Sequence, residues 1–355
     1  MDRATAPKVA GIDHSLIVIM AHPSPSPSVF RRSLGWLHKE WFLVGMLAAV
    51  ALATLQPDLG RSGGLLHAEL VTKLGIAIVF FLHGLGLSFA SLRQGVLSWR
   101  VHLVVQAMTF AVFPVTWLAA DALVGRWLPP DLALGFCYLC ALPSTISSSV
   151  ALTGLARGNV PAAIFNATLS SVLGIVITPL LVGLLARVDG QSLPFMETVI
   201  GIAQLLLLPL VLGQLARPLL HAWHHRHKRL TTLLDRWVIL LLVYSAFCDS
   251  VAGGLWRDNG VGTLLEAAVG AGVLLVLVLA LSTWMARRLG FSTEDEITAV
   301  FCGSKKTLAS GVPMAKLLFG ANPAIGLIML PIMFYHQIQL FVCALLANRY
   351  ARRRD

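Results

Sequence analysis

The sequence FCGSKKTLASGVP, residues 301–313, places two adjacent lysines, Lys305 and Lys306, in a stretch with apolar residues on both sides. A charge at the centre of a bilayer costs roughly 2.5–3.5 kcal/mol even on the most lenient insertion scale. A second stretch, ALPSTISSSVALTGLARGN at 141–159, combines a proline with a run of hydroxyl side chains. Because proline removes a helix hydrogen bond, both stretches predict interrupted helices, which at membrane depth need protein or water partners for the freed backbone.

The composition indicates that both stretches lie in a membrane. The 355 residues are 57% hydrophobic and 12% charged, whereas about 25% of residues are charged in an average soluble protein. The mean hydropathy is +0.78. A spanning helix needs about 20 mostly apolar residues, and we predict ten such segments: 34–56, 68–90, 99–124, 131–157, 160–187, 195–219, 232–255, 262–287, 296–319 and 323–348. These are too long and too uniformly apolar for β-barrel strands, so the predicted fold class is an all-α polytopic membrane protein.

The two unusual stretches occupy equivalent places in the predicted order of segments. They lie in the fourth and ninth segments, so each is fourth in its half of five. Five spans per half invert the second half, and paired broken helices in inverted repeats indicate a transporter binding site. The alternative is two kinked helices without any such relationship. We therefore predict four regions: a disordered tail at 1–33, five-helix repeats at 34–188 and 189–348, and a basic tail at 349–355.

The distribution of lysine and arginine predicts the orientation. Most of the 27 Lys and Arg residues fall in alternate loops and at both chain ends, and such loops face the cytoplasm. Both termini are therefore expected inside the cell, with the protein in the inner (plasma) membrane. The net charge of +10 reflects topology and contact with lipid headgroups rather than nucleic acid, because no soluble basic domain is present. Met1 and Met20 both remain possible starts.

Two motifs resemble metal or redox sites but have simpler interpretations. Cys137 and Cys140 form a C-x-x-C without a second pair, so two small apolar residues on one helix face are expected. The segment HAWHHRHKR at 221–229 is expected to be a basic cytoplasmic loop. We find no phosphate-binding loop and no signature of a nucleophile with its base, so neither an enzyme nor a cofactor is predicted.

Several stretches resemble the bile acid:sodium symporter family, in its orphan and bacterial branch. The resemblance covers about residues 34–350 and rests on four sequences, with YSAFCDS (244–250) supporting the branch: LPSTISSSVALTGLARGNVPAAIFNATLSSVLGIVITPLL (142–181), LPLVLGQLARP (208–218), FCGSKKTLASGVPMAK (301–316) and YHQIQL (335–340). It implies two inverted repeats, a core domain (segments 3–5 and 8–10) in which helices 4 and 9 break and cross, and a panel domain (segments 1, 2, 6 and 7) that moves against it. An organic anion would be carried between the two domains.

The resemblance also implies where sodium ligands would lie. A glutamine of the third span matches Gln106, but the family's shared glutamate falls on Phe301 and a glutamine ligand falls on Lys305. Ser148 and Ser149 replace a serine–asparagine pair. Fifth-span hydroxyl ligands fall on alanines, beside which two polar residues could substitute: Asn166 and Thr168. Sodium prefers oxygen ligands, and an ammonium in contact range would repel it by roughly 4 kcal/mol at a dielectric near 20, so sodium coupling is in doubt.

The adjacent lysines allow three interpretations. An ammonium can neutralise the carbonyl ends of broken helices, or it can join half-helix N-termini after Pro143 and near Thr307 in binding an anion. Adjacent positions point about 100° apart on a helix, so one lysine can do each; we assign the structural role to Lys306 and the anion contact to Lys305. The third interpretation is that both side chains extend to water.

Two further ionisable residues are candidates for the same region. Asp249 is expected either as the counter-charge of Lys305 or near the outer interface. His336 is a further group at mid-membrane depth, which could also serve only to bond the broken backbone.

Together these features predict a secondary active, symporter-like transporter of a small organic anion that works by alternating access. Coupling to protons, to residual sodium or to no ion remains open, and no oligomeric state is assigned. The alternative is a non-transporting regulatory membrane protein on the same scaffold. The predicted binding residues are Gln106, Ser144, Thr145, Ser148, Ser149, Asn166, Thr168, Asp249, Ser304, Lys305, Lys306, Thr307 and His336.

Overall fold

The computed structural model describes residues 41–64, 66–86, 96–185, 200–201, 203–320 and 322–353. The chain divides into two compact units, Met1–Val44 and Gly45–Asp355, and apart from the first four residues of α2 the features below belong to the second unit. The predicted tail at 1–33 lies outside the described residues. Within the described ranges the regular structure is helical throughout, without strands.

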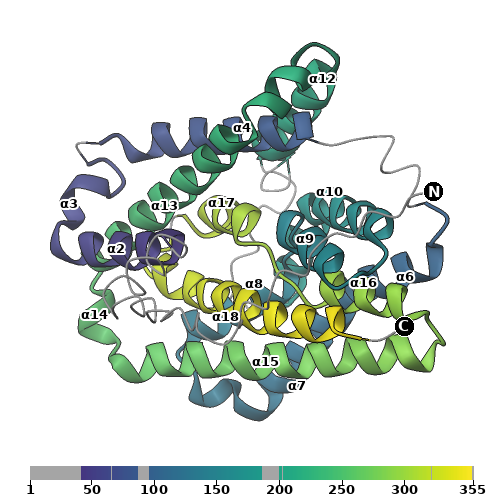
Figure 1. Cartoon of the computed structure of the whole chain (residues 1–355). Helices are drawn as coiled ribbons and strands as arrows, with labels where there is room; N and C mark the ends of the chain where they lie inside the picture. Colours follow the sequence, from purple (N-terminus) through teal and green to yellow (C-terminus); the bar gives the residue numbers. More distant parts are fainter. Residues whose placement is uncertain are drawn as a thin grey trace, which may run out of the picture. The chain divides into compact units, whose positions relative to one another are not determined.

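The helices follow one another along the chain as labelled in Figure 1. Two are π-helical (η1 and η3) and one is a 3₁₀ turn (η2). In chain order they are α2 (Trp41–Leu55), α3 (Pro57–Gly60), α4 (Ala68–Gly86), α6 (Trp99–Ala107), η1 (Met108–Val112), α7 (Phe113–Val124), η2 (Gly125–Trp127), α8 (Pro130–Ala141), α9 (Ser147–Leu155), α10 (Val160–Leu185), η3 (Ala203–Leu207), α12 (Leu208–Arg226), α13 (Lys228–Ala252), α14 (Leu255–Asp258), α15 (Val261–Arg288), α16 (Thr293–Gly303), α17 (Leu308–Phe319) and α18 (Ile325–Ala351).

Six helices in the described ranges are long and apolar enough to cross a membrane: Trp99–Trp127, Val160–Leu185, Ala203–Arg226, Lys228–Ala252, Val261–Arg288 and Ile325–Ala351. Each overlaps one of the ten predicted segments. The predicted first and second segments contain α2 and α4, and the fourth and ninth are each divided into two shorter helices. The prediction of an all-helical polytopic membrane protein is confirmed to this extent, while ten spans in inverted repeats stay a prediction.

Both predicted interruptions are present. The first break, residues 142–146, separates α8 from α9, and the second break, residues 304–307, separates α16 from α17. At the first break Leu142 adopts an extended backbone before Pro143 (ψ 151°), as a residue preceding proline prefers. Thr307 is also extended and accepts a hydrogen bond from the Ser310 amide, so it caps α17. Pro313 lies inside α17 and does not cause the second break.

The start of α16 explains how one half-helix is placed beside its neighbours. Ser292 caps it by accepting from the Asp295 amide, and three acidic residues fill its first turn, where the helix dipole favours negative charge. The Asn159 side chain caps the start of another helix, α10, by accepting from the Ala162 amide at 3.1 Å. The same side chain donates to Asp295 Oδ1 at 2.9 Å, so two helix starts are joined by one residue.

Small residues allow some helices to approach closely. A Cβ added at Gly213 of α12 would lie 2.0 Å from the Phe81 carbonyl oxygen of α4, and one at Gly84 of α4 would lie 2.1 Å from the Leu210 oxygen. Between α8 and α18, a Cβ at Gly135 would lie 2.5 Å from the Ile328 oxygen. Close backbone contact through small residues is the usual way for helices to associate within lipid.

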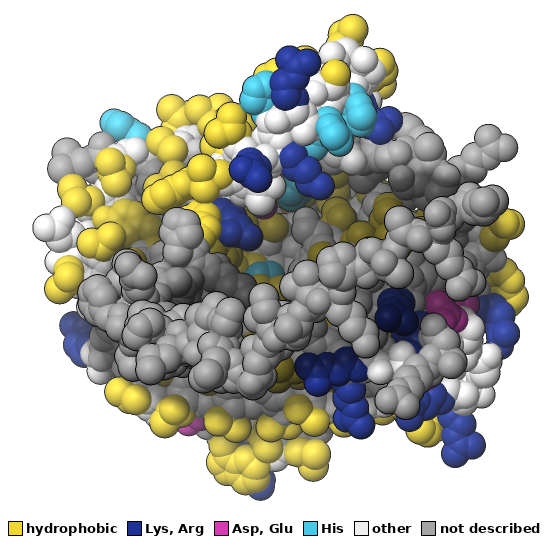
Figure 2. Space-filling view, viewed as in Figure 1, with side chains coloured by type: hydrophobic (Ala, Val, Ile, Leu, Met, Phe, Trp, Pro, Cys, Tyr) yellow, Lys and Arg dark blue, Asp and Glu magenta, His cyan; other side chains and the backbone are white. Residues whose placement is uncertain are grey.

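Burial separates the inner helices from those that face outward. Every residue of α16 from Glu296 onward is buried, as is most of the first half of α18. By contrast, α15 exposes apolar side chains along its length, including Val269 and Val273. Figure 2 shows apolar side chains over the lower edge of the view, where α7 and α15 lie, which is the surface expected for contact with lipid.

We expect Gly213→Ala to destabilise the protein, because the added methyl group would collide with the α4 backbone and force α4 and α12 apart. Such overpacking costs about 1–3 kcal/mol, measurable as a lower melting temperature of the purified protein in detergent. The matched control is Gly272→Ala on α15, where a Cβ meets nothing within 4 Å and alanine favours the helix. Equal melting temperatures for the two variants would contradict the close contact between α4 and α12.

Candidate functional site

Lys306 lies at the centre of the contacts between the two breaks. Its ammonium nitrogen donates to the carbonyl oxygens of Thr109 (2.9 Å), Cys140 (2.9 Å) and Leu142 (2.6 Å). It also lies 3.9 Å from the centroid of the Phe113 ring, a cation–π contact. The side chain is completely buried. All three ammonium hydrogens therefore have acceptors, and two of these acceptors belong to the carbonyl end of α8.

The third acceptor is available because of a local irregularity in the third predicted span. Thr109 belongs to the π-helical turn η1. In that register its carbonyl would be paired with the nitrogen five residues later, which belongs to Pro114 and carries no hydrogen. The irregular turn thus leaves a carbonyl for Lys306. Turns of this kind are common at functional sites.

Other groups satisfy the remaining carbonyls at the end of α8. The Thr178 hydroxyl donates to the Ala141 carbonyl at 2.8 Å. The Thr307 amide donates to the Pro143 carbonyl at 3.1 Å, which joins the two breaks directly through their backbones. Backbone groups freed at membrane depth are thereby paired within the protein, as the absence of water in a bilayer demands.

Hydroxyls of the first break and of α9 bond the carbonyl end of α16 in the same way. Ser144 Oγ donates to the Cys302 carbonyl at 2.6 Å, and Ser149 Oγ donates to the Phe301 carbonyl at 3.2 Å. The Ser144 amide is itself bonded to Ser170 Oγ at 2.9 Å. Within the predicted run of hydroxyl residues, the side chains of Ser144 and Ser149 are thus already bonded to backbone carbonyls of α16.

Two residues of α18 complete the second break. Tyr335 donates its hydroxyl to the Ser304 carbonyl at 2.6 Å. The Gln339 amide accepts from the Lys306 N–H at 2.9 Å and donates to the Lys306 carbonyl at 2.8 Å. His336 Nδ1 lies 3.1 Å from Gln339 Nε2, so His336 contacts the residue that holds the broken backbone.

Lys305 has a different environment from its neighbour. Its side chain is completely buried, yet its ammonium nitrogen has no hydrogen-bond partner in the described part of the chain. A buried charge without a partner is costly. The adjacent lysines thus differ: Lys306 is saturated by carbonyls and Lys305 is not.

Gln106 of the third predicted segment and Asn166 of the fifth lie together. Gln106 Nε2 lies 3.3 Å from both the carbonyl oxygen and Oδ1 of Asn166. Asn166 in turn donates to the Ala162 carbonyl at 3.0 Å. Gln106 Oε1 is buried and unpaired within the described residues, so one acceptor remains free beside a buried amide.

Thr145 and Ser148 pair with each other at 3.2 Å. Ser148 is partly exposed, and α9 begins next to it without a side-chain cap. The first N–H groups of a helix carry a partial positive charge, so this end suits an anion. Thr168 is buried on α10.

The predicted pair of Asp249 with Lys305 is wrong. Asp249 forms an ion pair with Lys316 of α17, and it accepts from the Ser62 amide at 2.6 Å and the Ser62 hydroxyl at 3.2 Å. Lys316 lies nine residues beyond the second break, whereas Asp249 lies in the last turn of α13. The carboxylate is therefore beyond the breaks, and its position near the outer interface stays a prediction.

Several functional residues were missed by sequence reasoning. Tyr335 and Gln339 belong to the motif YHQIQL, but nothing in its spacing indicated that they bond the second break. Thr109 and Thr178 act through single contacts distant in sequence. The five cysteines are unpaired and buried, and the described residues contain no group of three metal-binding side chains.

The comparison with known proteins assigns the family. The model of the SBF-like CPA transporter family matches residues 40–352. The chain belongs to this family. An uncharacterized protein of Pseudomonas aeruginosa is 49% identical over 314 residues, covering 88% of this chain and 93% of the relative. A putative symporter of Escherichia coli, YfeH, is 44% identical over 318 residues (88% and 93%), and rat sodium/bile acid cotransporter 7 is 33% identical over 322 residues (89% and 93%).

These findings confirm the relationship to the bile acid:sodium symporter family and place the chain in a family of membrane transporters. In this SBF-like member, the position implied for a shared sodium-binding carboxylate holds Phe301, which is completely buried. The ammonium of Lys306 supplies positive charge between the two breaks.

We expect Lys306→Met to destabilise the protein strongly and Lys305→Met to leave its stability unchanged or raised. Removing the Lys306 ammonium leaves three buried carbonyls unpaired, at about 1–3 kcal/mol each. Methionine at 305 instead replaces an unpartnered buried charge with an apolar chain of similar length. The melting temperatures of the two variants in detergent provide the measurement. Equal losses of stability would show that the two lysines do not differ in this way.

Proposed function

We propose that this protein is a secondary active transporter that carries a small organic anion by alternating access. The observation that supports this most is the buried ammonium of Lys305, which lacks a partner in the described structure. It is adjacent in sequence to Lys306, which is bonded to Leu142 of the first break. In a transporter family, an unpaired cation between helix interruptions is suited to a substrate of opposite charge.

The anion site would combine Lys305 with the uncapped start of α9. Its first turn contains Ser148, whose hydroxyl pairs with Thr145 and can also donate to a carboxylate or sulfonate. Helix N-termini bind anions through their free N–H groups. Gln106 and Asn166 would contribute an amide pair to the same region of the core.

Sodium would not be the coupling ion in this proposal. Lys306 occupies the carbonyls at the end of α8 with a covalently tethered cation, and Phe301 offers no side-chain oxygen. Transport would then be coupled to protons or to no ion. The names of the sodium/bile acid cotransporters refer to sodium and bile acids as solutes of those proteins. In this chain the residues favour an anion without a sodium requirement.

The ion pair between Asp249 and Lys316 would close the outer side of the transporter. It joins α13, part of the panel domain implied by the resemblance, to α17 of the core. The pair is largely buried, at 13% and 12% side-chain exposure, so opening a path there requires its separation. Both termini would lie in the cytoplasm, and the protein would reside in the inner (plasma) membrane.

The direct test measures binding and proteoliposome uptake of a panel of carboxylates and sulfonates that includes a bile acid. We expect Lys305→Gln to weaken binding of the transported anion by about tenfold or more, which is 1.4 kcal/mol per decade. Lys228→Gln, which changes an exposed lysine at the start of α13, is the matched control. Replacing Na⁺ with K⁺ should leave uptake unchanged.

Two outcomes of this test would oppose the proposal. Failure to bind or take up any anion of the panel would favour a non-transporting regulatory protein. Uptake that stops without Na⁺ would show that sodium is still bound despite Phe301 and Lys306.

A separate prediction concerns the outer ion pair. Asp249→Asn should increase labelling of a cysteine placed at Ser148 by an impermeant maleimide added outside, because the closed outer side loses its charge pair. Asp58→Asn is the control, since Asp58 pairs with Arg61 while 78% exposed. Exchanging the charges (Asp249→Lys with Lys316→Asp) should reduce labelling again. Labelling that is unchanged in Asp249→Asn would exclude the pair as a gate.

A further inference from the structure

A groove of about 620 Å³ lies between α15 and α18, away from the two breaks. Both helices contribute to its apolar lining. One end of the groove is formed by the last two turns of α15. The aliphatic residues that line it are Leu279, Ala280, Val342 and Leu346. Since α15 exposes apolar side chains along its length, such a groove opens toward lipid.

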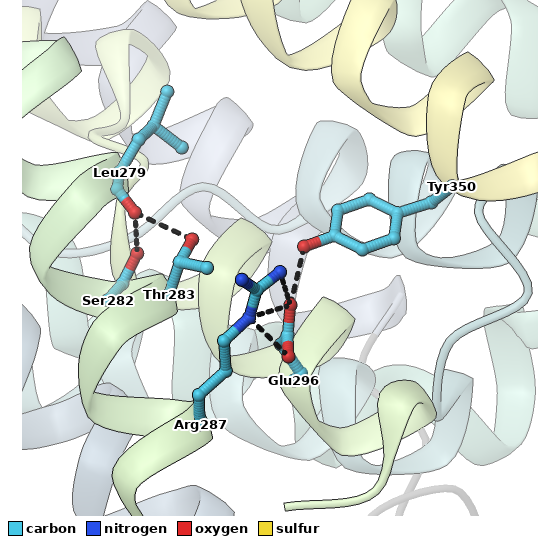
Figure 3. Close-up of polar contacts among 6 residues, drawn as sticks. All are labelled: Leu279, Ser282, Thr283, Arg287, Glu296 and Tyr350. Atoms are coloured by element: carbon cyan, nitrogen blue, oxygen red, sulfur yellow. Dashed lines mark hydrogen bonds and ion pairs between the residues drawn. The ribbon is translucent and has the colours of Figure 1, made fainter.

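The end of the groove carries two adjacent arginines. Arg287 is held in place by Glu296, with Nε and Nη2 between 3.2 and 3.3 Å from the carboxylate oxygens, and Tyr350 donates to the same carboxylate at 2.8 Å (Figure 3). The Arg287 side chain nevertheless remains 66% exposed. Glu296 offsets the charge of Arg287, so the net positive charge of the rim comes from Arg288.

Arg288 is exposed and lies over the Trp284 ring, 5.8 Å from its centroid. Trp284 is itself 58% exposed, and tryptophan prefers the level of the lipid headgroups. Dark blue side chains gather on the lower right of Figure 2, where α15 and α18 end. The groove therefore has an aliphatic part and, at the end of α15, a cationic and aromatic rim.

We propose that this groove binds an anionic phospholipid, with an acyl chain against the aliphatic residues and the phosphate between Arg287 and Arg288. Arginine binds phosphate with paired, charge-assisted hydrogen bonds, and basic pockets between membrane helices on the cytoplasmic side suit anionic headgroups. A free phosphate ion would use the rim but not the aliphatic lining. Because α18 also carries Gln339, which bonds the Lys306 backbone in the second break, the bound lipid would stabilise the helix that supports the proposed transport site.

The test uses the full-length protein in phosphatidylcholine nanodiscs with and without phosphatidylglycerol, and reads the phosphatidylglycerol-dependent rise in melting temperature. We expect Arg288→Gln to weaken the apparent affinity for phosphatidylglycerol about fivefold, which is about 1 kcal/mol at 1.4 kcal/mol per decade. Ala280→Trp should fill the groove and reduce the same response. Inorganic phosphate added to the wild type in phosphatidylcholine should have no effect.

Matched controls separate this site from general surface charge. Arg226→Gln removes an exposed arginine from the last turn of α12, and Val269→Trp enlarges an exposed residue of α15 three turns before Ala280. Both should respond to phosphatidylglycerol like the wild type. The proposal is overturned if phosphatidylglycerol stabilises no more than phosphatidylcholine, if Arg226→Gln loses as much response as Arg288→Gln, or if inorganic phosphate reproduces the effect.

Discussion

Two helices that stop in a membrane must find partners for their carbonyl groups, and the core depends on how this requirement is met. Lys306 donates to the carbonyls of Cys140 in α8 and Leu142 in the first break. Ser144 of the first break and Ser149 of α9 donate to carbonyls of α16 in return. Each interrupted helix is thus completed by the other, and neither arrangement would be stable in lipid without its counterpart.

The contrast between the adjacent lysines follows from the same contacts. The Lys306 ammonium contacts three carbonyls and an aromatic face in place of water. These contacts offset the cost of burying its charge. Lys305 is equally buried but unpartnered among the described residues. A protein that needed only a structural cation would not require the second lysine, and this difference supports a role for Lys305 toward a bound anion.

The second break and the partner of Asp249 show where local sequence patterns cease to be informative. Proline and hydroxyl residues predicted the interruption near Pro143 correctly, but Pro313 lies within α17 and the second break instead follows Gly303. Asp249 was expected to pair with Lys305 or to lie near the outer interface, and the first of these expectations is wrong. Its partner is Lys316 rather than Lys305, because the partner depends on which turn of α17 passes α13.

The amino-acid sequence by itself determined that this is a helical membrane protein, that its fourth and ninth segments are interrupted, and that charged residues lie inside them. These conclusions depend on hydropathy, proline and capping, which act over a few neighbouring residues. The tertiary structure alone decided which lysine donates to the carbonyls and which has no partner among the described residues. Lys306 and Leu142 are 164 residues apart, and contacts over such separations depend on how the helices pack, which no local pattern of residues specifies.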